Sequence, residues 1–479
     1  MPHRTLADFL EDLGRAGELA AVDAEVDPCG EAAEVTRRVA RQGGPALLFR
    51  SVRGHDVPLL TNLLGSESRV LRALGAESME EAAARVDRAI HAGGGEGWLE
   101  RLGFGGKHMA TMANRVKSAA CQQIVRIGSD IDLLELPLPQ AASPVIHSAV
   151  ILSAAPDTHA QVFLRGDLQV TGRDTAVVAW SEMADPARLV GEYGNRGGRM
   201  PVAVVLGGDP AVQLAAAAPL PSAVDPLGLA GLLREKPLDA VGCRSIDLLV
   251  PAESDFIIEG HIEPAEPAVS TGPRLSLMGQ VLSGRPGHVL HVTALTHRAN
   301  RVFPAMVPGV GNECFLRDRL AAQLFLPYLK LRIPELVDVD LPPSGGARHV
   351  AVLAIRKTYA GQARQVATAA WGMRPFAFAR LLVVVDADID VRDAEQVLAA
   401  VAREAHCTDD VWELAGPGDP LDPTSAWGEL NRRLAVDATR NLAGEGRTPH
   451  AAHPATDDDI EKLVGDRWAE YGLGPEPSL

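Results

Sequence analysis

The sequence predicts an α/β (α+β multidomain) protein with a β-rich middle, and three observations support this. Helix and strand patterns alternate up to about residue 115. Short β-rich runs separated by turn residues then recur from about 120 to 325, and a βαβα pattern follows residue 330. We place the domain limits at 1–115, 116–325 and 326–479. A chain of 479 residues is long enough to form three domains.

The N-terminal part combines helices with a short buried strand. Thr5-Leu6-Ala7-Asp8 resembles a capping box, with Asp in place of the usual Glu, and apolar residues follow it at helical spacing. Residues 31–42 predict a second helix, and 46–49 a buried strand. Residues 79–102 are mostly helical in pattern and are interrupted by glycines. This part therefore reads as an α/β domain.

The middle part contains many short strands and few long helices, a combination that predicts a barrel or a strongly bent sheet. The run 255–263 partly alternates between apolar and polar residues, as a strand with one solvated face would. The expected strands are 145–153, 160–170, 175–180, 201–206, 246–250, 255–263 and 287–295.

The C-terminal part alternates buried strands with helices. Val350 to Ile355 predicts a strand, 361–371 a helix and 381–385 a second strand, and Asp393 can cap a helix over 394–405. This alternation favours a parallel sheet with crossover helices. We expect a last helix, at about 457–470, to dock on a neighbouring subunit.

Composition excludes several classes of function. The net charge of −16 argues against nucleic acid, which needs a positive protein surface. No apolar run approaches 18 residues, so we expect no membrane span. The first residues do not form a signal peptide, and the five cysteines form no CxxC pair. We therefore expect a cytoplasmic protein with reduced thiols.

Three segments are candidate sites on their chemistry alone, each with an alternative. Val204–Pro210 is a strand with a glycine turn, which indicates either a nucleotide site or simply a tight turn. Lys357 follows a buried strand and can either meet a phosphate or be solvated. Asp386, Asp388 and Asp390 can either bind a hard cation or serve as turn and cap residues.

Short segments along the whole chain match, in order, the pattern of one known family. They are Leu6-Ala7-Asp8-Phe9-Leu10, Pro45-Ala46-Leu47-Leu48-Phe49, Met200-Pro201-Val202-Ala203-Val204, Gly207-Gly208-Asp209-Pro210, Leu248-Leu249-Val250-Pro251-Ala252, Thr296-His297-Arg298, Lys357 with Tyr359 and Gly361, and Val385-Asp386-Ala387-Asp388-Ile389-Asp390. With these segments the chain resembles the UbiD family of prenylated-FMN-dependent (de)carboxylases.

The resemblance implies a fold and a chemistry. The middle domain would be a split β-barrel of flavin-reductase-like type that holds prenylated FMN, with a divalent metal and potassium at the phosphate. In the family, Asn, His and Glu bind the metal, and an Arg with two acidic residues acts on the substrate. The flavin serves as an electron sink, and a glutamic acid delivers the proton after carbon dioxide leaves.

The metal ligands of the family do not carry over to this sequence. The glutamate position holds Pro226, next to Asp225, and the histidine position falls near Met183. The asparagine position falls at Ala160 or Val162. A thioether is a poor ligand for a hard cation, and alanine and proline side chains supply no ligand atom. The resemblance therefore gives no metal site, and we expect no divalent metal.

The catalytic residues carry over only in part. Arg165 matches the substrate arginine when a two-residue gap is allowed, and Asp167 takes that place without it. The acidic segment of the family reads Thr271-Gly272-Pro273-Arg274-Leu275-Ser276, so both acids are absent. Losing a general acid typically costs 10²–10⁴-fold in rate. A replacement acid is therefore needed, and we assign it to Glu313, with Glu266 and Asp225 as alternatives.

The cofactor contacts implied by the resemblance are mostly backbone contacts, which tolerate changed side chains. They fall at Phe163, Leu164, Ala218 and Pro219, with Lys357 at the phosphate.

These expectations support a carboxy-lyase acting on a small unsaturated or aromatic carboxylic acid, as a homo-oligomer (dimer or hexamer). Two alternatives remain open. One is different chemistry on the same scaffold without prenylated FMN. The other is a non-catalytic partner subunit of an active relative.

Overall fold

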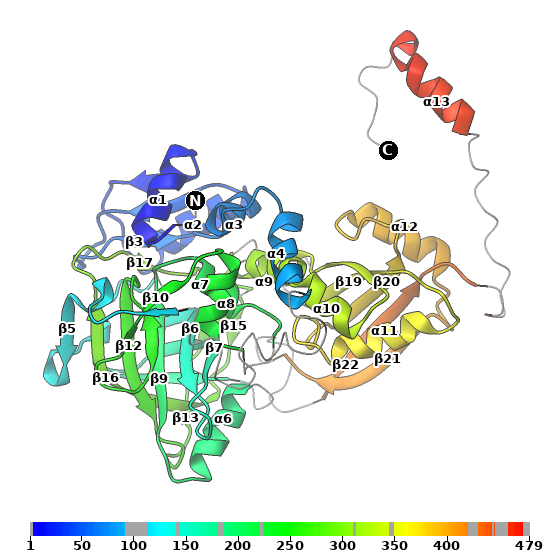
Figure 1. Cartoon of the computed structure of the whole chain (residues 1–479). Coiled ribbons are helices and arrows are strands. Elements are labelled where there is room, and N and C mark those ends of the chain that lie inside the picture. Colours follow the sequence, from blue (N-terminus) through cyan, green and yellow to red (C-terminus); the bar gives the residue numbers. More distant parts are fainter. Residues whose placement is uncertain are drawn as a thin grey trace.

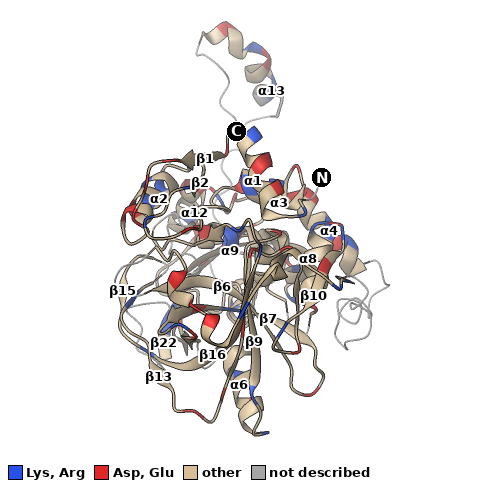
Figure 2. Cartoon of the chain, turned by 90° about the vertical axis from the view of Figure 1, so that its left-hand side faces the viewer, with Lys and Arg blue, Asp and Glu red and all other residues tan. Residues whose placement is uncertain are grey.

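The structure is a computed structural model that describes residues 3–91, 113–139, 144–180, 185–220, 224–276, 278–309, 313–343, 349–419, 430–442, 445 and 458–472. Figure 1 shows the N-terminal elements lying over one end of a barrel, and a separate C-terminal sheet beside the barrel. Basic and acidic residues are interspersed along the N-terminal helices (Figure 2). Of the helices in these ranges, none has the length and apolar character needed to cross a membrane.

The N-terminal elements surround a four-stranded sheet in the order β1-β2-β3-β17. The predicted capping box is confirmed, because Thr5 and Asp8 each accept a hydrogen bond from the other's backbone N–H. Strand β17 comes from beyond the barrel, so this sheet joins the start of the chain to its middle. The elements are α1 (Leu6–Arg15), β1 (Leu19–Val22), α2 (Glu31–Arg41), β2 (Ala46–Phe49), β3 (Leu59–Thr61), α3 (Glu67–Leu74), α4 (Met79–His91) and β17 (Phe303–Pro304).

The middle of the chain forms a closed barrel of six antiparallel strands, which confirms the predicted fold class. The strand order is β12-β9-β6-β7-β8-β16, and pairing of β12 with β16 closes the ring. Its interior is filled by aliphatic residues that alternate along the strands. The strands are β6 (Val145–Ala154), β7 (Gln161–Val170), β8 (Thr175–Ala179), β9 (Met200–Leu206), β12 (Phe256–Ile262) and β16 (Pro286–His297).

Smaller elements decorate the barrel. Strand β5 pairs with β16, and a separate sheet in the order β11-β10-β4 lies beside it. The elements are β4 (Ala113–Arg115), β5 (Ile124–Ile127), α6 (Asp185–Gly194), α7 (Ala211–Ala216), α8 (Pro226–Leu233), β10 (Leu238–Gly242), β11 (Leu249–Pro251), β13 (Val269–Ser270), β14 (Arg274–Leu275) and β15 (Val281–Leu282).

The C-terminal part is a five-stranded sheet in the order β18-β19-β20-β22-β21. Its three central strands are parallel, as the βαβα pattern predicted, with α11 on one face and α12 on the other. Helix α13 projects away from the body of the molecule (Figure 1). The elements are α9 (Glu313–Leu324), α10 (Leu326–Arg332), β18 (Leu336–Asp340), β19 (Val350–Ile355), α11 (Gln362–Trp371), β20 (Leu381–Asp386), α12 (Ala394–Glu404), β21 (Val411–Pro417), β22 (Leu430–Ala438) and α13 (Asp458–Arg467).

Candidate active site

Arg165, on barrel strand β7, meets the first turns of helix α9. Its guanidinium donates to both carboxylate oxygens of Asp318, at 2.6 Å and 3.2 Å, and its Nη2 lies 3.6 Å from the Cys314 sulfur. Burial alone would lower the pKa of Arg165, but Asp318 and its other neighbours more than offset that and raise it above the usual range. The resemblance assigns the Arg165 guanidinium to a substrate carboxylate. In this structure the guanidinium instead binds a carboxylate of the chain itself, Asp318.

One helical turn of α9 brings a second guanidinium to the same place. Arg317 donates through Nη2 to the Ser148 hydroxyl at 2.6 Å and to the Cys314 sulfur at 3.1 Å. Its side chain is only 5% exposed, and its Nε lies 3.9 Å from Asp318, beyond hydrogen-bond distance. Since residues i, i+3 and i+4 share a helix face, Cys314, Arg317 and Asp318 all point at the barrel.

A bulge in strand β6 shapes the barrel side of this cluster. The register of β6 on β7 shifts between Ile146 and Ala149, and Ser148 has a φ of +49°, which few non-glycine residues adopt. The Ser148 N–H donates to Asp167 at 2.9 Å. The bulge therefore turns the Ser148 hydroxyl toward Arg317 while its backbone is fixed by β7.

Asp167 is a largely buried acidic group of the cluster with a lowered pKa. Its carboxylate lies 3.3 Å from the buried His147 ring and 3.8 Å from Arg274. Burial would raise the pKa of Asp167, but His147, the Ser148 N–H and Arg274 outweigh it and bring the pKa down to about 2. Asp167 is therefore ionised throughout the neutral range and cannot serve as a proton donor there.

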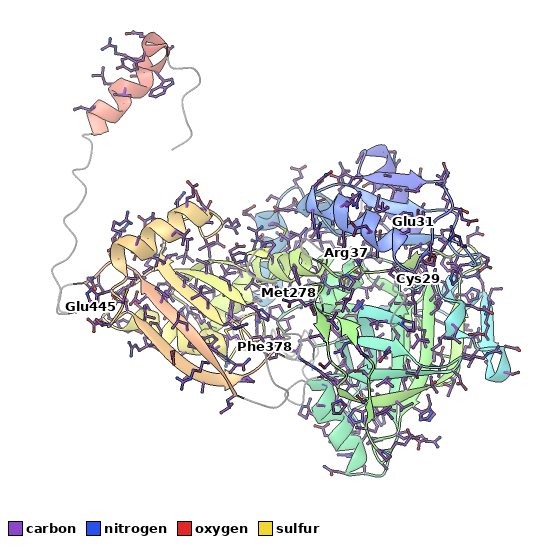
Figure 3. The ribbon with its side chains drawn as sticks, turned by 180° about the vertical axis from the view of Figure 1, so that it is seen from behind. Cys29, Glu31, Arg37, Met278, Phe378 and Glu445 are labelled. Carbon is purple, nitrogen blue, oxygen red and sulfur yellow. The ribbon has the colours of Figure 1, made fainter. Side chains whose placement is uncertain are left out.

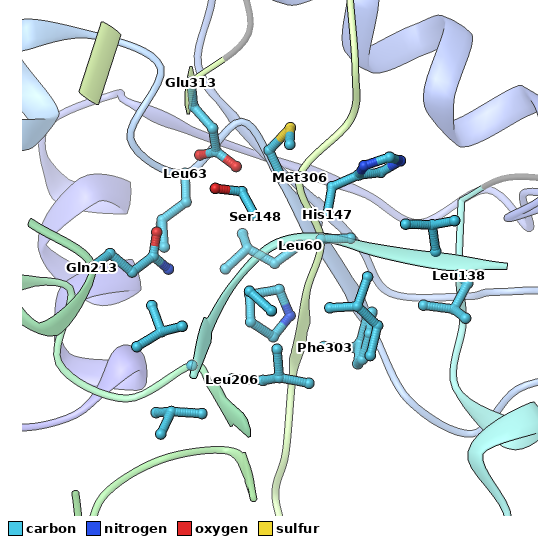
Figure 4. A pocket seen from close by; sticks show the side chains of 18 of the residues that line it. Leu60, Leu63, Leu138, His147, Ser148, Leu206, Gln213, Phe303, Met306 and Glu313 are labelled. Carbon is cyan, nitrogen blue, oxygen red and sulfur yellow. The ribbon is translucent and has the colours of Figure 1, made fainter. Parts of the chain in front are cut away.

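Glu313, the first residue of α9, lines a cavity of about 50 Å³ that also contains Ser148 and Arg317. Figure 4 shows the Glu313 carboxylate and the Ser148 hydroxyl facing one another at one end of this cavity. The carboxylate accepts the Leu64 N–H at 2.8 Å. Because the protein removes it from water, its pKa is raised, despite the opposing effects of this hydrogen bond and of Arg317. A carboxyl with a raised pKa can hold a proton nearer neutral pH, as a general acid must.

The residues at the family's two acid positions have structural partners. The Thr271 hydroxyl accepts the Arg285 N–H at 2.9 Å and a hydrogen bond from Arg274 at 3.2 Å. The Ser276 hydroxyl accepts backbone N–H groups of the β14–β15 turn, at 3.2 Å from Met278 and Gln280. Both side chains thus hold loop segments in place, and neither is a carboxylic acid that could donate a proton.

The backbone predicted to bind a flavin includes the part of strand β7 that pairs with β6 but not with β8. Residues Gln161–Gly166 are registered with β6, and β8 begins to pair with β7 only at Asp167. Phe163 packs against the same apolar cluster as Ala218, so β7 and the end of α7 are neighbours. Leu164 and Pro219 are buried, Leu164 in the apolar cluster that fills the barrel. The backbone contacts of a flavin with these four residues remain a prediction.

Lys357 lies at the carboxyl edge of the C-terminal sheet, with its side chain only 2% exposed. Its ammonium donates to Glu445 at 2.9 Å and lies 3.9 Å from Asp437. The Glu445 carboxylate also accepts the N–H of Gly361, at the start of α11. Figure 3 shows Glu445 at the far end of the C-terminal part, whereas Met278 and Phe378 lie near its junction with the barrel. The structure therefore does not bring Lys357 to β7, and its assignment to a phosphate remains a prediction.

The positions of the family's metal ligands offer no donor set in the described residues. Val162 is buried among apolar side chains, and Pro226 begins helix α8. Asp225 caps that helix by accepting the Leu227 N–H at 3.1 Å. Ala160 has a methyl side chain, and Met183 lies outside the described residues. These residue types do not fit a divalent metal.

Two other sequence candidates have local explanations. Glu266, an alternative acid, lies 2.8 Å from the half-buried His291. The turn at Gly207 and Gly208 has φ values of +74° and +83°, and a Cβ on Gly207 would lie 2.7 Å from that of Asp255. Asp255 also accepts the Gly208 N–H at 3.0 Å, so the tight-turn interpretation of this segment fits the contacts.

Several residues of the cluster were not anticipated. Cys314, Arg317 and Asp318 follow the predicted Glu313 on the same helix, and Ser148 lies in the bulge. The signal available was the spacing of Glu313, Arg317 and Asp318, which places charged side chains on adjacent ridges of one helix. The contact of that helix with Arg165 joins residues 153 positions apart, a pairing that local patterns do not reveal.

Three stretches of the chain match known domains of one carboxy-lyase family. Residues 10–89, 114–311 and 318–438 match, in order, the N-terminal, Rift-related and C-terminal domains of 3-octaprenyl-4-hydroxybenzoate carboxy-lyase (UbiD). The barrel with its flanking domains is thus a carboxy-lyase architecture. The chain belongs to the UbiD family. An uncharacterized protein of Archaeoglobus fulgidus is 33% identical over 454 residues, which cover 93% of this chain and 94% of that protein.

Solved structures show the same architecture. The UbiD-class enzyme HmfF of Pelotomaculum thermopropionicum, in complex with FMN, is 29% identical and gives a TM-score of 0.76, covering 95% of this chain and 98% of its own. The vanillic acid decarboxylase of Sedimentibacter hydroxybenzoicus, in its closed form, is 24% identical with a TM-score of 0.87, covering 99% and 100%. Its open form gives 0.76, so the parts of this chain are arranged more as in the closed form.

Proposed function

We propose that this chain is a carboxy-lyase of the UbiD type that acts on an unsaturated or aromatic carboxylic acid, with Glu313 as the proton donor. One observation carries the proposal. On a UbiD-family barrel, helix α9 carries both Asp318, which binds Arg165, and Glu313, a carboxyl group with a raised pKa, while the family's own acid positions hold Thr271 and Ser276. The missing acid is therefore replaced from a neighbouring element.

A flavin is the cofactor that this site supports. The relative HmfF was solved with FMN and, in an evolved dimeric form, with prFMN. In this chain the backbones of Phe163, Leu164, Ala218 and Pro219 would hold it, and the prenylated ring would supply the electron sink for decarboxylation. Lys357, which binds Glu445 away from β7, would not contact the phosphate of a flavin held there in this arrangement of the chain.

The test combines cofactor analysis with an activity assay. The protein is expressed with and without a prenyl-flavin-making enzyme, examined by native mass spectrometry, and then given unsaturated and aromatic acids while carbon dioxide release is followed. We expect a bound prenylated flavin and a rate that Glu313→Gln lowers about 10²–10⁴-fold. A protein free of flavin under both conditions would exclude the proposal.

A second function, a non-catalytic partner subunit, is favoured by the bidentate contact between Arg165 and Asp318. A catalytic arginine that the chain itself neutralises must exchange Asp318 for substrate before it acts. Co-purification with a second UbiD-type chain, which restores activity that neither chain shows alone, would support this function over the first.

We also infer that the chain is a homo-oligomer. On helix α13 and the turn after it, Ile460, Leu463, Val464 and Tyr471 are exposed, and they recur at helical spacing. Such a stripe on a helix that projects from the body fits a neighbouring copy of the chain. Light scattering should give a dimer or larger assembly, and Leu463→Glu should reduce it.

A further inference from the structure

A second and larger cavity, of about 360 Å³, lies where the C-terminal end of α8 meets the β11-β10-β4 sheet. Strand β10 packs beside α8 (Figure 1). The cavity is separate from the candidate active site: Asp209 precedes α7, whereas the predicted flavin contacts Ala218 and Pro219 follow it. Small-molecule sites measure about 300–1,000 Å³, so the cavity has the size of a ligand site. Its charged lining residues are Arg4, Asp209, Arg234, Lys236, Asp239 and Glu253.

The sheet side of this cavity is acidic. Asp239 lies on β10, and Glu253 follows β11, the strand that pairs with β10. Asn114 donates to Asp239 at 3.3 Å and Arg298 donates to Glu253 at 3.2 Å, which holds both carboxylates in place. Nη2 of Arg4 bridges the two carboxylates, at 3.3 Å and 3.4 Å. The Arg4 side chain is 68% exposed, so water screens these contacts and an incoming cation can replace it.

The helix side of the cavity is basic. Arg234, the C-cap residue of α8, is only 7% exposed, and its Nη1 lies 2.6 Å from Asp209. Its Nε has no hydrogen-bond partner among the described residues. A buried N–H without an acceptor is costly, so an oxygen atom of a ligand would be stabilised there. Lys236, two residues further on, is exposed and lines the same cavity, so this side presents two cations and one carboxylate.

We propose that this cavity binds a small zwitterion of the α-amino-acid class. The ammonium group of the ligand would lie between Asp239 and Glu253, where the Arg4 nitrogen now lies. Its carboxylate would accept hydrogen bonds from Arg234 and Lys236. The three lining carboxylates disfavour a ligand that is only anionic, and the three lining cations disfavour one that is only cationic. A cavity that binds benzene measures about 150 Å³, so this one has room for an amino-acid side chain as well.

The test measures binding to the full-length protein. Melting temperatures are recorded with each of the common α-amino acids, and those that raise the melting temperature are then titrated calorimetrically. The tightest-binding amino acid should bind at least tenfold more tightly than its N-acetyl derivative, which lacks the ammonium, or its methyl ester, which lacks the carboxylate. Absence of binding by every amino acid, or equal binding of the three forms, would overturn the proposal.

Variants assign the binding to this cavity. Arg4→Gln frees the two carboxylates from the chain's own cation and should strengthen amino-acid binding about twofold to fivefold. Asp239→Asn should weaken it about tenfold, and Lys236→Gln about twofold to fivefold. The exposed Arg15 and Lys330 supply matched controls, and Arg15→Gln and Lys330→Gln should leave binding unchanged. Unchanged affinity in Asp239→Asn or in Lys236→Gln, or weaker binding in Arg4→Gln, would contradict the proposed site.

A structural measurement covers the case in which Asp239→Asn fails to fold. Crystals of the unaltered protein grown with the tightest-binding amino acid should show density that contacts Asp239 and Glu253 at one end and Arg234 at the other. Density at another place on the protein would overturn the proposal. None of these readouts requires flavin or turnover, so they are independent of the carboxy-lyase function proposed above.

Discussion

Two cations of this chain, Arg165 on the barrel and Lys357 on the C-terminal sheet, both form ion pairs with the chain's own carboxylates. The numbers of cations and carboxylates that meet at the two places differ. On the barrel, Arg165 and Arg317 both lie within 4.0 Å of one carboxylate, Asp318. On the sheet, Lys357 lies within 4.0 Å of two carboxylates, Glu445 and Asp437. The two regions therefore pair cations with carboxylates in opposite ratios at these contacts.

The largest effect should follow from removing the shared carboxylate of the barrel. Asp318→Asn removes the carboxylate that accepts two hydrogen bonds from Arg165 and lies 3.9 Å from Arg317, and removing one member of a buried pair costs about 3–5 kcal/mol. Urea unfolding of this variant should show that loss of stability. The double variant with Arg165→Met should recover much of it, because the stranded charge is removed. A loss below about 1 kcal/mol would mean that the barrel charges are solvated and the contrast with the sheet is false.

Two aspartates, Asp167 on the barrel and Asp437 on the sheet, should respond to pH in opposite directions. The pKa of Asp167 falls to about 2, from 3.8, so its contribution to stability is complete above about pH 5 and is lost as the pH falls toward 2. That shift corresponds to about 2 kcal/mol. Burial raises the pKa of Asp437, so its contribution is present at low pH and is lost as the pH rises through the raised value.

Unfolding free energies measured between pH 3 and 7 test this difference. Asp167→Asn should flatten the acid limb of the profile, and Asp437→Asn should flatten the rise in instability at higher pH. Identical profiles for the two variants would contradict the opposite directions of the two pKa shifts.

A smaller effect is expected at the sheet, where the Glu445 carboxylate binds the Lys357 ammonium. Glu445→Gln removes one of the two carboxylates and should strengthen binding of inorganic phosphate about tenfold, or roughly 1.4 kcal/mol. Titration calorimetry measures the change, and Lys357→Met in the same background should abolish it. Unchanged phosphate binding in Glu445→Gln would show that Lys357 has a structural role and does not bind phosphate.

Much of the fold could be predicted from the sequence, because local sequence signals agree with the structure. The Thr5 capping box, the Asp393 cap and the apolar runs of β19 and β20 each formed as predicted. Closure of the barrel through β12 and β16 is a long-range pairing: the strand pattern left a barrel and a strongly bent sheet both open, and the resemblance to a known family favoured the barrel.

The residues of the candidate site could be predicted from the sequence only in part, for a physical reason. Helix α9 is buried on nearly all sides, so it lacks the apolar stripe that would separate its structural residues from its polar contacts. Glu313 was singled out, but Arg317 and Asp318 gain their importance from Ser148 and Arg165, which other strands supply. These contacts belong to the assembled cluster and not to any one segment.

The smallest effect is expected at the exposed pair of Asp388 with Arg440, on the same sheet edge as Lys357. Both side chains are more than half exposed, so solvent screens them and Asp388→Asn should cost less than about 1 kcal/mol, a difference that high salt removes. Asp386 accepts the Arg440 N–H at 2.8 Å, and Asp390 accepts the Arg392 N–H at 2.9 Å. Since these aspartates already have partners, we expect added Mg²⁺ or Ca²⁺ to leave the melting temperature unchanged. A cation-dependent rise that Asp388→Asn abolishes would instead make this edge a metal site, and the excess of carboxylates there would be its ligand set.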